Sequence, residues 1–158
     1  WRQSAGAADH AAIEAAMAAA EVSHLRTRAV TTLSGGERMR VLLARIFAAQ
    51  PQMILADEPI AALDPYHQLH VMELLREHAH GAGEPRAVLA VLHDLNLAAR
   101  FCDRLILMAH GRVVCEGAPR TVLTAENLQT VYGVSARIVD NAGDFSVMPW
   151  RPNAASSM

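Results

Sequence analysis

The sequence predicts an α/β protein with a mostly parallel sheet flanked by helices. Two short apolar runs, MILA at 53–56 and AVLAVL at 87–92, are typical of buried strands, and a helical pattern separates them. Both runs end abruptly in polar residues, as parallel strands do at the edge of a sheet where ligands bind. Strands that alternate with helices in this way favour an α/β sheet.

The composition excludes several kinds of function. Hydrophobic residues make up 52% of the 158 residues and aromatic residues only 4%, which predicts an aliphatic core. The net charge of −2 does not favour nucleic-acid binding. No apolar run approaches the ~20 residues of a membrane span, so we expect no membrane insertion. All 14 basic residues are arginine, so no step can use a lysine.

The first third of the chain predicts two helices. An alanine-rich helix is expected over 7–22, followed by a connector over 24–32. A second helix should open at Ser34, because Glu37 stands three residues later and completes a capping box. Five apolar residues are expected to face the core from this helix: Met39, Leu42, Leu43, Ile46 and Phe47.

The remaining elements follow from caps and turns. Asp64 and Pro65 predict the start of a helix that runs to about residue 78, and Asp94 predicts a cap for the next one. His110-Gly111 predicts a two-residue hairpin. Further along, the sequence predicts a short helix from Thr124 to Gly133, a hairpin over 134–149 and a disordered tail over 150–158.

Gly35 and Gly36 open the second helix, although glycine costs a helix about 1 kcal/mol relative to alanine. Bare backbone at a helix N-terminus lets an anion reach the unpaired amides, and the Ser34 hydroxyl adds a donor. This pattern predicts a phosphate site. A capped helix whose first turn merely tolerates glycine explains it about equally well.

Asp57 and Glu58 follow the first strand directly. Paired carboxylates at the end of a buried strand are costly unless they bind a metal or do acid–base work. In phosphoryl chemistry the first would organise Mg²⁺ and the second would polarise an attacking water. A helix cap beside a surface acid is the alternative. His93 ends the second strand, where an imidazole could reach the same pocket, although a single histidine is more often structural.

These motifs occur in one order: LSGGE at 33–37, DEP at 57–59, ALD at 62–64 and then His93. Together they resemble the nucleotide-binding subunit of ABC transporters, with its signature, Walker B strand, D-loop and switch histidine. The sequence over 91–119 and 126–134 is similar to importers of the haem, iron–siderophore and cobalamin class. The resemblance covers about 10–149 and departs from the family at Met39, Ile60 and Ala61.

The resemblance implies a partial P-loop NTPase fold of RecA-like type and an ATPase that energises import. Two such subunits pair head to tail and contact transmembrane permease subunits at the cytoplasmic face of the membrane. Ser34, Gly35 and Gly36 would bind the γ-phosphate of ATP held by the partner subunit. Asp57 would hold Mg²⁺ through water, and Glu58 would act as general base. His93 would contact the γ-phosphate, and Asp64 would organise the dimer interface.

The same resemblance implies a division of the chain into a remnant of the helical subdomain (1–49), the C-terminal part of the RecA-like core (50–133), the hairpin (134–149) and the tail (150–158). The chain contains no G-x-x-x-x-G-K-[ST] phosphate loop, and no Q-loop is found. We therefore expect the C-terminal part of an ABC ATPase that is poorly soluble and does not bind ATP by itself.

Two other functions remain open. A non-catalytic fragment could lend its signature to an intact partner. An ABC-type ATPase of DNA maintenance would carry the same signature, although the chain lacks the coiled-coil or zinc-binding insertions of that class. Four histidines, His67, His70, His78 and His80, are interpreted as a solvated helix face, with a metal-binding pair of His67 and His70 as the alternative.

Overall fold

The computed structural model describes residues 6–61, 63–81, 83–141 and 144–152. The chain forms two compact units, one up to Val91 and one from Leu92. This boundary lies inside the segment 50–133 that the sequence assigned to one core. Each unit is described separately below.

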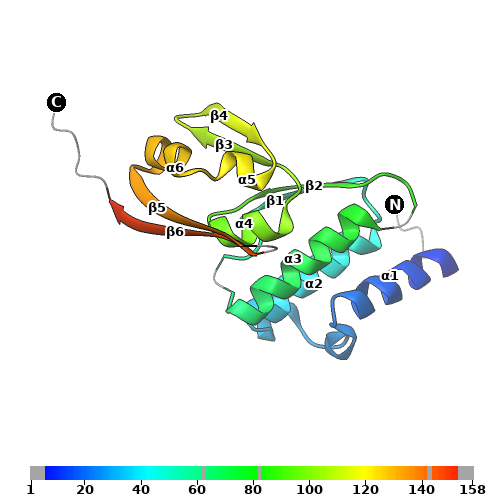
Figure 1. Cartoon of the computed structure of the whole chain (residues 1–158). Helices are drawn as coiled ribbons and strands as arrows, with labels where there is room; N and C mark the ends of the chain where they lie inside the picture. The colour runs from blue at the N-terminus through cyan, green and yellow to red at the C-terminus, as the bar shows by residue number, and fades with distance from the viewer. Residues whose placement is uncertain (1–5, 62, 82, 142–143, 153–158) are drawn as a thin grey trace. The chain divides into compact units, whose positions relative to one another are not determined.

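Within its described residues, the first unit contains three α-helices and a pair of strands, which can be followed in Figure 1. In chain order its elements are α1 Ala7–Ala19, the 3₁₀ turns η1 Ser23–Leu25 and η2 Val30–Thr32, α2 Gly35–Ala48, β1 Met53–Asp57, α3 Pro65–His80 and β2 Ala87–Val91. Helix α1 lies along α2, α2 lies beside α3, and α3 packs on β2. The helices therefore line one side of the strand pair.

Strands β1 and β2 are parallel, with Leu55 opposite Leu89 and Asp57 opposite Val91. Ile54 is buried at 4% exposure, whereas Leu55 is 71% and Leu89 51% exposed. The apolar run of β1 predicted a strand covered on both faces. Within the described residues of this unit, α3 packs on one face of the strand pair and no helix packs on the other.

Helix α2 is rotated from the predicted orientation. Leu43 and Ala44 are buried, and the ring of Phe47 stacks on His78 of α3 at 5.2 Å between centroids. Leu42 and Ile46 were expected in the core but are 40% and 38% exposed. The helix packs between α1 and α3, so the residues that face these two neighbours are buried in place of one continuous stripe.

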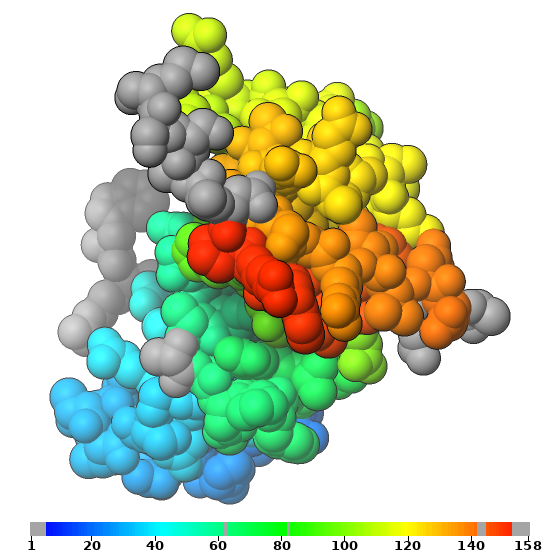
Figure 2. Space-filling model, turned by 60° about the vertical axis from the view of Figure 1, so that its left-hand side comes forward, coloured from blue at the N-terminus to red at the C-terminus, as the bar shows by residue number. Residues whose placement is uncertain are grey.

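The second unit contains α4 Leu95–Phe101, β3 Leu105–Ala109, β4 Arg112–Gly117, α5 Pro119–Val122, α6 Ala125–Tyr132, β5 Val134–Asn141 and β6 Asp144–Pro152. Its strands form two antiparallel pairs, β3–β4 and β5–β6. Leu123, Leu128 and Val147 form its core. Figure 2 shows β6, in red, on the surface next to β5.

The predicted turns of this unit are confirmed. His110 and Gly111 have φ of 50° and 73°, as a primed hairpin turn requires. Gly133 ends α6 with φ 64°, and Thr124 caps it. The last hairpin extends to Pro152, so residues 150–152 belong to β6, whereas the sequence placed them in a disordered tail. The Arg137 guanidinium lies 3.9 Å from the centroid of the Trp150 ring, which holds this end of the strand. The rest of that tail, 153–158, lies outside the described residues.

Among the described helices, none is both long enough and apolar enough to cross a bilayer.

Candidate functional site

The N-terminus of α2 has the predicted capping box. The Glu37 amide donates to Ser34 Oγ at 3.2 Å, and the Ser34 amide donates to Glu37 Oε2 at 2.8 Å. The hydrogen bond from the Ser34 amide is the largest cause of the lowered pKa of Glu37, and a hydrogen bond from the Ser34 side chain to the carboxylate adds to it. The Ser34 side chain therefore accepts from the Glu37 amide and also hydrogen-bonds to the Glu37 carboxylate.

Gly35 and Gly36 occupy different surroundings. A Cβ built on Gly35 would meet nothing within 4 Å, whereas one on Gly36 would lie 3.1 Å from Cγ and Cδ2 of His67. Gly35 is exposed and Gly36 half-buried. The space at Gly35 is open to a ligand, and the absence of a side chain at Gly36 is explained within the chain itself.

Asp64 begins α3 and lies in the same unit. Its Oδ1 accepts from the His67 amide at 3.1 Å, and its Oδ2 lies 2.7 Å from His67 Nδ1. These hydrogen bonds, the backbone one foremost, lower the pKa of Asp64. The structure therefore brings Asp64 and the Gly35–Gly36 turn together through His67, which was not among the predicted site residues. The available signal was its position three residues after a capping aspartate.

The interpretation of the α3 histidines as a solvated face is wrong for His67, His70 and His78, whereas His80 is exposed as predicted. The side chains of His67 and His70 are 25% and 16% exposed, and His78 is buried at 8%. His70 stacks on Tyr66 and lies 3.8 Å from Glu21, while His78 Nε2 donates to the Pro51 carbonyl at 3.0 Å. The alternative of a metal-binding pair finds no support either. Within the described ranges, no group of three or more His, Cys, Asp or Glu side chains could hold a metal.

Asp57 and Glu58 stand at the C-terminal end of β1, and both are exposed. Glu58 adopts φ 46°, a left-handed conformation that is uncommon outside glycine and clusters at functional sites. Its amide donates to the Val91 carbonyl at 3.2 Å, and its carbonyl accepts from the Ala61 amide at 3.1 Å. These bonds fix the backbone of Glu58 at the edge of the parallel pair.

The chemistry of these donors fits Mg²⁺. Magnesium is usually bound by one or two carboxylates, with waters and phosphate oxygens completing its shell. An exposed Asp57 at a strand end provides one such carboxylate and leaves room for the other ligands.

His93 belongs to the second unit. It is exposed, lies two residues beyond the end of β2, and directly precedes Asp94, which caps α4. Asp94 Oδ1 accepts from the amides of Asn96 and Leu97 at 2.8 and 2.9 Å. This cap fixes where α4 begins and therefore where His93 stands along the chain.

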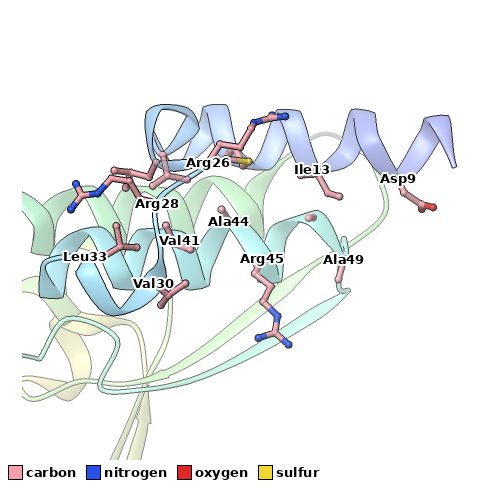
Figure 3. Close-up of a pocket in the computed structure, with 14 residues that line it drawn as sticks. Asp9, Ile13, Arg26, Arg28, Val30, Leu33, Val41, Ala44, Arg45 and Ala49 are labelled. Carbon is pink, nitrogen blue, oxygen red and sulfur yellow. The ribbon is translucent and has the colours of Figure 1, made fainter. Parts of the chain in front are cut away.

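An apolar groove of about 520 Å³ lies between α1, the middle and end of α2 and the connector before α2 (Figure 3). Ile13 contributes from α1, Leu33 from the connector and Val41 from α2. Arg26, which pairs with Glu14, and Arg28, which pairs with Glu37 at 3.3 Å, lie at the connector side. None of the residues predicted for catalysis or phosphate binding lines this groove.

Comparison with known proteins links these features to one family. A family model described as ABC transporter matches residues 2–61. The hemin import ATP-binding protein HmuV of Bordetella avium is 47% identical over 133 residues, 80% of this chain and 50% of that protein. The cobalamin import ATP-binding protein BtuD of Halobacterium salinarum is 43% identical over 94% of this chain and 38% of its own length. The ferric enterobactin transport ATP-binding protein FepC of Escherichia coli is 39% identical over 99% of this chain and 56% of its own length.

Solved structures agree. An ABC transporter in an inward-facing conformation superposes with a TM-score of 0.78 at 26% identity, covering 94% of this chain and 59% of that one. The ATP-binding cassette MJ0796, solved as a dimer with ADP and Pi, gives a TM-score of 0.63 at 32% identity over 76% of this chain and 51% of its own. The α/β fold is therefore that of P-loop NTPase domains, as predicted. The chain spans about half the length of the curated relatives it matches, and it belongs to the ABC transporter family.

Proposed function

We propose that the chain is part of the ATP-binding subunit of an ABC importer, and that the start of α2 binds the terminal phosphate of ATP held by a second subunit. The observation that carries this proposal is the open backbone at Gly35, next to the hydroxyl of the capping residue Ser34. The amides of Gly35 and Gly36 make no hydrogen bond within the described residues. Unpaired amides at a helix N-terminus attract phosphate oxygens.

The other site residues have roles that fit their positions. Asp57 would hold Mg²⁺, which neutralises phosphate charge when bound. Glu58 would accept a proton from the attacking water, and His93 would hydrogen-bond to the γ-phosphate. Asp64, fixed by His67, would contact the second subunit. The pairing of two subunits is supported by the dimeric MJ0796 structure.

The names of the relatives support import rather than DNA maintenance, and they include hemin, cobalamin and ferric enterobactin as cargo. We propose a compound of this class for the whole transporter. Transmembrane permease subunits would then be further partners, and the protein would lie at the cytoplasmic face of the membrane. In this proposal α1 and α2 belong to the helical subdomain and β1, α3 and β2 to the RecA-like core.

The experiment measures ATP-dependent association between this chain and an intact ATP-binding subunit that carries its own phosphate loop and lacks the catalytic glutamate. We expect the chain to associate only with ATP present. G35E should weaken the association by at least about tenfold, because it introduces bulk and negative charge where phosphate would bind. The same change at an exposed site on α1, A11E, is the matched control.

Association that is equally strong with and without ATP, or that G35E leaves unchanged, would contradict the proposal. ATPase assays then separate a catalytic part from a non-catalytic one that only lends its signature. If Glu58 is a catalytic base, the mixture should hydrolyse ATP faster with the wild-type chain than with E58Q. Equal rates with both would favour the non-catalytic alternative.

A further inference from the structure

The imidazole of His67 makes two contacts of different chemistry. Its Nδ1 lies 2.7 Å from Asp64 Oδ2, and its Cγ and Cδ2 lie 3.1 Å from the position of a Cβ on Gly36. The first contact fixes the orientation of the ring, and the second places the ring against the first turn of α2. One side chain thus links the start of α3 to the start of α2.

We propose that His67 is a positioning residue that holds the phosphate-binding turn of α2 in register with the Asp64 carboxylate. The inference rests on the proposed function, because it assigns a purpose to the contact only if that turn binds phosphate. The contact itself exists within one chain, so it can be tested without a partner.

The Asp64 side of the link is well defined. Both carboxylate oxygens accept hydrogen bonds from His67, one from its amide and one from its ring. These bonds lower the pKa of Asp64, so the carboxylate is ionised at neutral pH. An ionised carboxylate can only accept, and Nδ1 must therefore carry the proton. The ring is further restrained by Tyr66, which packs edge-on against it at 5.4 Å between centroids.

The Gly36 side of the link is steric. A ring held by Asp64 and Tyr66 cannot move far, so a methyl group at position 36 would force it or the helix to shift. Gly35 is the matched control, because it lies one residue away in the same turn and has open space around it. The two glycines should therefore respond differently to the same substitution.

The first test is a double-mutant cycle on thermal unfolding of the chain. In the wild-type background, G36A should lower the Tm by about 2–4 °C. In an H67A background the same change should be neutral or stabilising, because the ring is gone and alanine favours a helix. G35A should have the same effect in both backgrounds. An identical effect of G36A in both backgrounds would show that the His67 ring does not pack against position 36.

The second test separates the two contacts by two variants. H67N keeps a donor for Asp64 but removes the ring from Gly36, and H67F keeps a ring but removes the donor. NMR titration should show a higher pKa of the Asp64 carboxyl in H67F than in the wild type, because the ring donor is lost and only the bond from the backbone amide of residue 67 is kept. In H67N the pKa should stay closer to that of the wild type. Both variants should weaken ATP-dependent association with an intact subunit several-fold, whereas H10N on α1 should not.

The outcomes separate this inference from the function. If both His67 variants associate as tightly as wild type while the cycle confirms the contact, the positioning role is overturned and the proposed function stands. If the wild-type chain does not associate at all, the proposed function fails, and with it the role toward phosphate. The cycle then still decides whether His67 determines the need for glycine at position 36.

Discussion

Asn96 and Val147 are joined by two hydrogen bonds that run in opposite directions. Asn96 Nδ2 donates to the Val147 carbonyl at 3.1 Å, and the Val147 amide donates to Asn96 Oδ1 at 2.8 Å. Val147 is 1% exposed and belongs to the core of the second unit. A side chain on α4 thus pairs a backbone segment of β6 as a neighbouring strand would.

This pairing predicts a specific cost for N96D. Aspartate keeps the acceptor but places a second oxygen against the Val147 carbonyl, so one buried group loses its partner. We expect the free energy of unfolding of the second unit to fall by about 1–3 kcal/mol. Hydrogen exchange at the Val147 amide measures this loss. N141D, the same change at an exposed residue, should leave that exchange rate nearly unchanged. Equal effects of the two variants would refute the prediction.

His78 predicts a dependence of stability on pH. Burial, the largest cause, lowers the pKa of His78 in the folded chain. As the pH falls below about 6.5, His78 therefore takes up a proton in the unfolded chain before it does so in the folded chain. The contribution of His78 to the free energy of unfolding is present above that pH and is lost as the pH falls through the folded pKa. Denaturant unfolding at pH 7.5 and 5.5 tests this.

H78Q retains a donor for the Pro51 carbonyl but does not titrate, so it should flatten the loss of stability between these two pH values. H10Q, which changes an exposed histidine on α1, should retain the wild-type loss. A wild-type slope in H78Q would show that another group is responsible.

The open face of the β1–β2 pair predicts poor solubility of the isolated chain. Leu55 and Leu89 are cross-strand partners and are 71% and 51% exposed. Exposed apolar sheet surface favours association. L55E combined with L89R should raise the soluble fraction and reduce binding of a hydrophobic dye, because opposite charges in paired positions are compatible with the sheet. I54T, on the buried face, should instead destabilise the unit. Unchanged dye binding in the double variant would show that the dye binds elsewhere.

Cys102 is predicted to be a slow thiol. Burial, the main cause, raises its pKa in the second unit. Since the thiolate is the reactive form, alkylation at pH 8 should be slower than that of free cysteine. The test uses C115S, which leaves Cys102 as the only thiol, and follows alkylation with and without denaturant. A native rate equal to the denatured rate would contradict this.

Much of the local structure could be predicted because it depends on short-range chemistry. The Ser34–Glu37 capping box, the Asp64, Asp94 and Thr124 caps and the His110-Gly111 turn are each determined by residues within four positions. Caps and turns satisfy backbone groups locally, so the sequence determines them without reference to the rest of the fold.

The burial of the apolar residues of β1 and α2 was predicted less accurately than the caps and turns. Hydrophobicity says that a residue can be buried, but only its neighbours determine whether it is. Leu55 and Leu42 are apolar and exposed, because among the described residues of their unit no element covers them. Arg40, which a helix pattern places outside, is 8% exposed.

By itself, the sequence determined the helices, the strands, the order of the motifs and the family to which they point. Tertiary structure alone decided that His67 lies over Gly36, because these two residues are 31 positions apart and meet only where α2 packs beside α3. It also decided that the two adjacent glycines differ, one facing open space and one facing a ring. Such contacts depend on how helices pack, and helix packing is set by the shapes of whole surfaces rather than by any local pattern.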